Sequence, residues 1–224
     1  MENEKLKPIK TIACFGDSHV SIFNHESSLI AVADLTRSDN FAMYQFGPWL
    51  AYRLPERIDE FKKIYETIDK SVAEYDLLIF GEIDCRAQVN KISLEQNRTP
   101  KDVISEIVGH YIAFINQTMD SKRLIIFSIP PCHIESPYEE FYRGNLGAHD
   151  CPRGTMKERN SYKKIFNQMM RSYCKDNGIK FISIFNQIQN HPEKSSLYLD
   201  EIHLDPIKIK PIVNRALVRA GLSV

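Results

Sequence analysis

Residues 10–18 read KTIACFGDS, a short apolar run followed at once by Gly, Asp and Ser. An apolar run of this length that ends at a glycine predicts a buried β-strand over 10–15. Gly16 relaxes the backbone, and Asp17 and Ser18 place side-chain oxygens where the strand ends. Nucleophilic serines are often found at such a position, and so are ordinary helix caps. On these residues alone both interpretations stay open.

The rest of the chain alternates between strand-like and helix-like segments. Compact apolar runs predict strands, whereas apolar residues at helical spacing and Ser/Thr caps predict helices. The predicted strands are 10–15, 40–47, 76–82, 123–131 and 179–185. The predicted helices are 57–75, one capped by Thr99 with a buried face ending at Ile115, one from Thr155 to Asn177, and 206–222. This alternation predicts an α/β protein with a three-layer α/β/α architecture and a mostly parallel sheet.

Polar residues and glycines follow directly after four of the predicted strands. The segments are Gly16–His19, Gly47, Gly81–Arg86 and Pro130–His133. In open α/β sheets the ligand lies at the carboxyl ends of the strands. We therefore expect these four segments to meet at one edge of the sheet.

The composition limits the compartment and the partners. The 224 residues fit a single domain, 1–224, and 29 basic residues balance 29 acidic ones, which favours neither nucleic acid nor an anionic membrane as partner. The charged start and the short apolar stretch after it predict neither a signal peptide nor a membrane span. Five cysteines at irregular spacing argue against a disulfide framework and for a reducing, cytoplasmic location.

A second polar motif lies near the other end of the chain. Residues 197–206 read LYLDEIHLDP and place Asp200 three residues before His203, just ahead of the last predicted helix. A serine nucleophile needs a base, and the base works best when a carboxylate fixes its tautomer. An Asp-x-x-His turn can supply both groups, provided that the imidazole reaches Ser18. Alternatively, the pair simply caps the helix.

Taken together, Gly-Asp-Ser after the first strand and Asp-x-x-His before the last helix resemble the SGNH (GDSL-type) esterase/lipase superfamily. The resemblance runs from residue 11 to the C-terminal helix and implies that family's flavodoxin-like α/β/α fold. It also implies that Ser18 is the nucleophile, His203 the general base and Asp200 the partner that orients it. The backbone N–H groups of Ser18 and Gly47 would then form the oxyanion hole, and no cofactor would be needed.

One block departs from the family pattern. Where the family has Gly-x-Asn-Asp, residues 80–86 read FGEIDCR, so Ile83 replaces an asparagine that donates to the oxyanion. Losing such a donor costs about 10²–10³ in rate. Another donor such as Arg86 could replace it, the enzyme could be slow or specialised, or the chain could bind a ligand without turnover. Similar GEID-x-R blocks occur in SGNH-like proteins associated with bacterial surface glycans, which suggests a carbohydrate substrate.

The charged residues of this block have two interpretations. In an extended segment Glu82, Asp84 and Arg86 would share one face. They could bind sugar hydroxyls or replace the missing donor. Alternatively, they form an internal ion-pair network that holds the loop.

Several other polar residues have a functional and a structural interpretation. His133 follows a predicted strand and either lines the pocket or caps a loop. His19 either contacts substrate or is a partly exposed histidine at a helix start. The long segment 132–154 is either a binding loop, with Tyr138, Phe141, Tyr142 and Arg143 suited to a sugar ring or an acidic group, or a loop packed on the body.

The histidines and cysteines do not suggest a metal. Cys132-His133 and His149-Asp150-Cys151 lack the spacing of a zinc site, so we expect no metal.

The sequence therefore predicts a serine esterase. It would remove a small acyl group, with acetyl preferred, from a carbohydrate or a related small ester through an acyl-serine intermediate. Two alternatives are an acyltransferase of glycan biosynthesis with the same triad and a catalytically silent glycan-binding module. The sequence assigns neither the exact substrate nor the oligomeric state.

Overall fold

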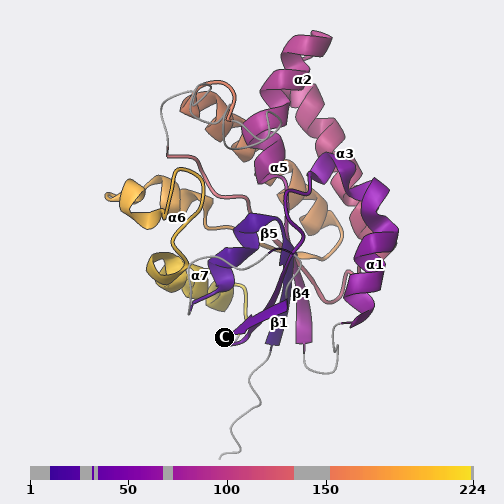
Figure 1. Cartoon of the computed structure of the whole chain (residues 1–224), viewed down its shortest axis with the longest axis vertical. Coiled ribbons are helices and arrows are strands. Elements are labelled where there is room, and N and C mark those ends of the chain that lie inside the picture. Colours follow the sequence, from indigo (N-terminus) through magenta and orange to yellow (C-terminus); the bar gives the residue numbers. More distant parts are fainter. Residues whose placement is uncertain (1–10, 26–31, 33–34, 68–72, 134–151, 223–224) are drawn as a thin grey trace, which may run out of the picture.

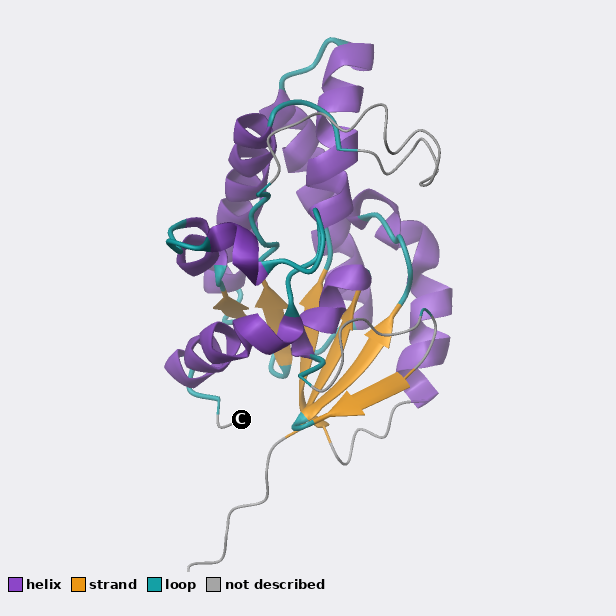
Figure 2. Cartoon of the chain, turned by 60° about the vertical axis from the view of Figure 1, so that its left-hand side comes forward, coloured by secondary structure: helices purple, strands orange, loops and turns teal. Residues whose placement is uncertain are grey.

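The computed structural model describes residues 11–25, 32, 35–67, 73–133 and 152–222. Six strands form one sheet in the order β2-β3-β1-β4-β5-β6 (Figures 1 and 2). Among the strand pairs of the described residues, β2–β3 is antiparallel and the others are parallel. The strands are β1 (Thr11–Gly16), β2 (Leu35–Ser38), β3 (Phe41–Gln45), β4 (Ala73–Ile79), β5 (Leu124–Phe127) and β6 (Lys180–Ile182).

Helices cover both faces of this sheet, which confirms the predicted three-layer α/β/α fold (Figure 2). One face carries α1 (Ile58–Thr67), α3 (Pro100–Thr118) and α5 (Met156–Asp176), and the other carries the short helix η1 (Ser18–Phe23), α6 (Phe185–Gln189) and α7 (Pro206–Arg219). The other helical segments among the described residues are η2 (Ala51–Arg57), η3 (Asp84–Gln88), α2 (Val89–Gln96) and η4 (Lys194–Leu197).

The residues of the central strand β1 explain why the sheet lies between two layers of helices. Ala13 and Phe15 point to the core on the α3 side, and Ile12 and Cys14 point to the core on the α7 side. All four are buried, as expected for a parallel strand covered on both faces.

Two predicted helix starts are confirmed at atomic detail. The hydroxyl of Thr99 accepts the backbone N–H of Asp102 at 3.2 Å. Thr155 and Glu158 form a reciprocal capping box at the start of α5. These caps are local, so the sequence is enough to predict them.

Other element boundaries differ from the predictions. The helix predicted over 57–75 ends at Thr67, and Ala73–Tyr75 belong to β4. Ala73 and Tyr75 pair with Thr11 and Ile12 of β1, so sheet pairing replaces helix at this end of the segment. The antiparallel strand β2 and the helices α2 and α6 were not predicted, because their segments are short or weakly periodic.

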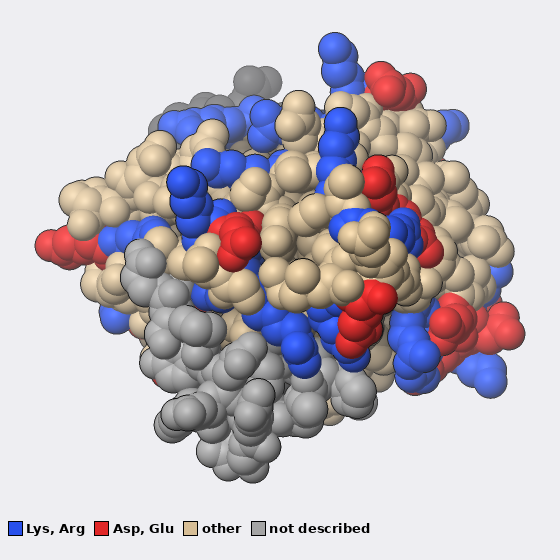
Figure 3. All heavy atoms as spheres, turned by 90° about the horizontal axis from the view of Figure 1, so that it is seen from above, with Lys and Arg blue, Asp and Glu red and all other residues tan. Residues whose placement is uncertain are grey.

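The surface carries both signs of charge. In the view of Figure 3, Lys and Arg side chains are interspersed with Asp and Glu side chains. This mixture agrees with the equal numbers of acidic and basic residues in the sequence. Among the described residues, no helix combines the length and apolarity that crossing a bilayer requires.

Candidate active site

Ser18 lies at the carboxyl end of the central strand. It is the first residue of η1, immediately after Gly16 of β1 and the N-cap Asp17. The Asp17 side chain accepts the backbone N–H of His19 at 2.9 Å, so the helix cap is Asp17 and not Ser18. The Ser18 hydroxyl is therefore left for another partner.

That partner is His203, which is 185 residues away in sequence. Its Nε2 lies 2.9 Å from Ser18 Oγ, and its Nδ1 lies 2.8 Å from Asp200 Oδ2. The other oxygen of Asp200 accepts the backbone N–H groups of Ile202 and His203, both at 2.7 Å. The three side chains form one continuous hydrogen-bonded chain.

The cap of the last helix is a different residue. Asp205 accepts the N–H groups of Ile207 and Lys208 at 3.0 and 3.2 Å. The capping alternative for Asp200 and His203 is therefore wrong: Asp205 satisfies the start of α7.

The hydrogen bonds around Asp200 also fix the state of the imidazole. Partial burial opposes ionisation, but the His203 ring and the two backbone N–H groups hold the pKa of Asp200 well below its usual range. An ionised carboxylate can only accept hydrogen bonds, so Nδ1 of His203 carries a proton. In the neutral ring, Nε2 then presents its lone pair to Ser18.

Gly47 follows β3, the neighbour of β1 in the sheet. The N–H of Phe46 donates to the carbonyl of Gly16 at 2.9 Å, which ties the end of β3 to the end of β1. Gly47 has φ +77°, a conformation that favours glycine. It thus lies at the same edge of the sheet as Ser18.

Asp84 holds the segment that follows Gly47. Its carboxylate accepts the backbone N–H groups of Ala51 at 2.7 Å and Tyr52 at 3.1 Å. Burial outweighs these hydrogen bonds and raises the pKa of Asp84 to about 7. Its observed contacts are structural, and they join the start of η3 to η2.

The block around Asp84 is helical, so Glu82, Asp84 and Arg86 do not share one face as they would in an extended segment. η3 is a π-helix over Asp84–Gln88. Glu82 and Arg86 are one turn apart and paired, with Arg86 Nε 2.9 Å from Glu82 Oε2, whereas Asp84 contacts η2. Ile83 is buried at 3% exposure.

Lys163 completes a buried ionic network around Glu82. Its ammonium donates to Glu82 Oε1 at 2.8 Å, from helix α5. Burial disfavours the carboxylate, but Arg86 and Lys163 lower the pKa of Glu82 well below its ordinary value. The ion-pair interpretation thus describes the contacts of Glu82 and Arg86. Sequence reasoning missed Lys163, although its place between Tyr162 and Phe166 on the apolar face of the predicted helix was a signal.

His19 is buried, so the prediction of a partly exposed histidine is wrong; it is 1% exposed. Its Nδ1 lies 3.0 Å from Asp17 Oδ1, and its Nε2 lies 4.0 Å from Glu82 Oε2. Burial favours the neutral ring, but the carboxylates of Glu82 and Asp17 raise the pKa of His19 above its usual value. These contacts connect the residue after Ser18 to the Glu82 network.

His133 lies near the loop that holds Asp200. Its ring stacks on Tyr198 with 3.8 Å between centroids, and partial burial lowers the pKa of His133. Tyr138, Phe141, Tyr142 and Arg143 lie outside the described residues, as do His149, Asp150 and Cys151. In the part of the chain that is described, no group of three or more His, Cys, Asp or Glu side chains could hold a metal.

Several solved structures resemble this chain over nearly its whole length. A lipase/acylhydrolase from Enterococcus faecalis has 13% identity and a TM-score of 0.56, covering 95% of this chain and 96% of that chain. An acetylxylan esterase from Geobacillus stearothermophilus, in a catalytic mutant, has 11% identity and a TM-score of 0.54, covering 96% and 95%. An alpha/beta hydrolase enzyme from the metagenome of Lake Arreo has 12% identity and a TM-score of 0.54, covering 96% and 97%.

At these identities the resemblance shows a shared fold. The chain has the three-layer α/β/α fold of these acylhydrolases and esterases. No model of a known protein family matches the sequence, and no curated protein matches it.

Proposed function

We propose that this protein is a serine esterase of the SGNH superfamily, with Ser18, His203 and Asp200 as its catalytic triad. The observation that carries the proposal is the hydrogen-bonded chain from Ser18 Oγ to His203 Nε2 and from His203 Nδ1 to Asp200. Its distances are those expected of a nucleophile, its base and the group that orients the base.

The reaction follows from this geometry. Ser18 Oγ attacks the ester carbonyl carbon while its proton passes to His203 Nε2, and Asp200 stabilises the imidazolium. The tetrahedral intermediate collapses, the bond to the alcohol breaks, and His203 gives the proton to the departing alkoxide. Water then attacks the acyl-serine with His203 as base, which releases the carboxylic acid and restores Ser18.

The backbone N–H groups of Ser18 and Gly47 are the proposed oxyanion donors. Ser18 begins η1, where N–H groups point out of the helix end. Pro48 has no N–H, so Gly47 itself must donate from the neighbouring strand end. Two donors in place of three predict a slower acylation step.

An acetylated carbohydrate is the proposed substrate. The support is that an acetylxylan esterase shares this fold over nearly the whole chain, together with the GEID-x-R block of the sequence. We propose that His133, which lies in the segment after β5 and stacks on Tyr198, contacts the bound ester.

A second candidate is a catalytically silent glycan-binding module. The observation in its favour is Ile83, an apolar and buried side chain where the family has a donor. This candidate predicts ligand binding that survives Ser18→Ala and no turnover in either form.

Covalent labelling separates the two candidates. The purified protein is treated with a small fluorophosphonate and analysed by intact and peptide mass, with Ser18→Ala and His203→Ala as controls. We expect stoichiometric label on Ser18 that requires His203. Folded protein that takes no label from probes of several sizes would refute the esterase and leave the binding module.

The products then distinguish hydrolysis from transfer. Acetylated xylo-oligosaccharides are incubated with the protein, with and without a non-acetylated sugar acceptor. Free acetate in both conditions indicates an esterase, and acetyl on the acceptor indicates an acyltransferase.

A further inference from the structure

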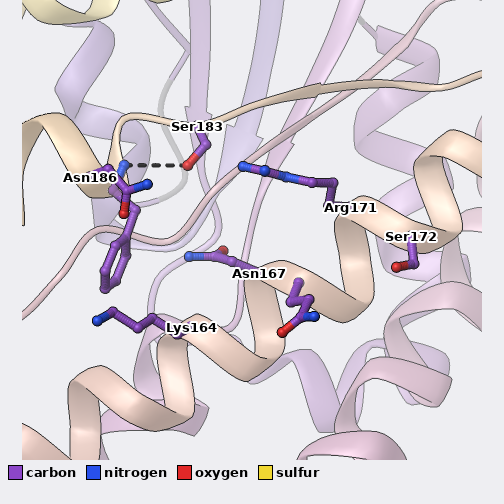
Figure 4. Close-up of a pocket in the computed structure, with 8 residues that line it drawn as sticks. Lys164, Asn167, Arg171, Ser172, Ser183 and Asn186 are labelled. Carbon is purple, nitrogen blue, oxygen red and sulfur yellow. Dashed lines mark hydrogen bonds between the residues drawn. The ribbon is translucent and has the colours of Figure 1, made fainter.

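A hollow separate from the Ser18 site lies between α5 and the segment after β6. Its volume is about 430 Å³. Helix α5 contributes Lys164, Gln168, Arg171 and Ser172, and Ser183 and Asn186 face them from the other side (Figure 4). Ser18, Asp200 and His203 are not among its lining residues.

Among the described residues, two cations and no carboxylate line the hollow. None of the ion pairs formed by the described residues includes Lys164 or Arg171. Each instead lies over an aromatic ring: Lys164 Nζ is 5.9 Å from the centroid of Phe185, and Arg171 Cζ is 5.3 Å from that of Phe181. Such contacts restrict where the cations sit.

A second hollow adjoins the first and is also lined by cations. It has a volume of about 510 Å³, shares Arg171, Ser183 and Asn186 with the first, and adds Gln187, Asn190 and Arg219. No carboxylate of a described residue lines the second hollow either. The two hollows form one groove with three cations, contributed by α5 and α7, in a protein whose total charge is zero.

The cations that line this groove repel each other, and an anion bound between them offsets this repulsion. The groove therefore fits a ligand with more than one negative group. Arginine in particular suits a carboxylate or phosphate, because its planar fork can donate two parallel hydrogen bonds.

The uncharged lining residues narrow the ligand class further. The amides of Gln168, Asn186, Gln187 and Asn190 carry both donors and acceptors, which match the hydroxyl groups of a saccharide. Asn167 is not available, since its amide is bonded to both backbone groups of Ile129. Phe185, which also lines the groove, is only 4% exposed and offers no platform on which a nucleic-acid base could stack.

We propose that this groove binds an acidic oligosaccharide. Lys164, Arg171 and Arg219 bind its negative groups, and the amides bind its hydroxyls. The proposal is independent of the esterase chemistry, because the groove shares no lining residue with the proposed triad.

The test uses trigalacturonic acid as probe and its fully methyl-esterified form as the uncharged match. Titration calorimetry at low salt is run on full-length protein carrying Ser18→Ala, so that no turnover interferes. The test variant is Lys164→Gln/Arg171→Gln. The control is Lys157→Gln/Lys175→Gln, which changes the net charge equally on exposed positions of α5 outside the groove.

We expect the acid to bind, the methyl ester not to bind, and the groove variant to lose affinity by about tenfold or more. The control variant should keep its affinity. Equal loss in both variants, equal binding of acid and ester, or no binding of the acid would overturn the proposal. So would binding of a single-stranded oligonucleotide in place of the acid. None of these results depends on whether Ser18 is a nucleophile, which the labelling experiment decides.

Discussion

The imidazole of His19 packs against that of His203, with 5.4 Å between the ring centroids and 34° between the planes. Each ring has a carboxylate at its Nδ1: Asp17 for the buried His19 and Asp200 for His203. Two carboxylate–imidazole pairs thus lie side by side, and His203 has a titratable neighbour directly after the proposed nucleophile.

His19→Asn should move the acid limb of the kcat/KM profile to higher pH. Asp17 and Glu82 raise the pKa of His19 despite its burial, and its cationic form disfavours a second cation at His203. Without His19 this repulsion is lost, so the acid limb should lie at higher pH.

His25→Asn is the matched control for that shift. His25 also has Nδ1 3.0 Å from a carboxylate, that of Asp39, but its ring contact is with Phe41. The acid limb of the kcat/KM profile of His25→Asn should lie at the same pH as that of the wild type. If both variants leave the acid limb unchanged, His19 does not influence the proposed base.

Asp200→Asn should lower kcat by about 10³-fold or more, with little change in KM. An amide at this position can present its NH₂ to the ring, which favours the wrong tautomer of His203. Asp205→Asn, five residues further on, should leave kcat within about twofold, since asparagine also caps helices well. Steady-state kinetics on a chromogenic acetate ester measures both, and equal rates for the two variants would argue against the triad.

Glu82→Gln should destabilise the fold by about 3–5 kcal/mol. It removes the buried carboxylate with which both Arg86 and Lys163 pair. Lys163→Met should cost less, because Glu82 keeps its pair with Arg86. Urea denaturation followed by circular dichroism measures the free energy of unfolding of both variants. A loss in Lys163→Met that equals or exceeds the loss in Glu82→Gln would contradict this account of the network.

Because of Asp84, the free energy of unfolding should fall as the pH rises. Its pKa is raised to about 7 in the fold, above the unfolded value of 3.8, so the folded state binds a proton more tightly than the unfolded state. The stabilisation is complete below the unfolded pKa and is lost as pH rises through about 7. Asp84→Asn removes this dependence but keeps only one acceptor for the N–H groups of Ala51 and Tyr52. The variant should therefore be less stable than wild type at pH 5, and the deficit should shrink at pH 8 in urea titrations.

Gly47→Ala should slow fluorophosphonate labelling of Ser18 and cost about 1 kcal/mol of stability. The residue has φ +77°, and an added Cβ would lie 3.2 Å from Val32. A shift of its backbone moves the proposed oxyanion donor. Gly109→Ala in α3 is the control: its Cβ would meet nothing within 4 Å, so stability should rise while labelling stays unchanged. Normal labelling of Gly47→Ala would exclude its N–H from the oxyanion hole.

Local sequence determined much of the fold. The apolar run before Gly16 became β1, and Thr99 and Thr155 begin α3 and α5 as predicted. These features depend on residues within a few positions of one another, so backbone sterics and local hydrogen bonds are enough to specify them. The alternation of strands and helices also predicts that the polar segments after the strands meet at one edge of the sheet, because parallel strands end on the same side.

The sequence did not predict the contacts between distant segments. Glu82 has a counter-ion 81 residues away in Lys163, and Asp84 binds backbone groups more than 30 residues before it. The helical form of 82–88 also differs from the extended segment that alternating charges suggested. Burial and long-range pairing decide these features, and neither is visible in a short window of residues.

The sequence by itself determined which residues could carry the chemistry, namely Ser18, Asp200 and His203, and the alternation of strands and helices that implies a parallel sheet. Only the tertiary structure decided that His203 Nε2 lies 2.9 Å from Ser18 Oγ and that Asp205 rather than Asp200 caps α7. The physical reason is that a hydrogen bond needs sub-ångström placement of both partners. Such placement comes from packing η1 and the loop before α7 at the same end of the sheet, and residue spacing does not encode it.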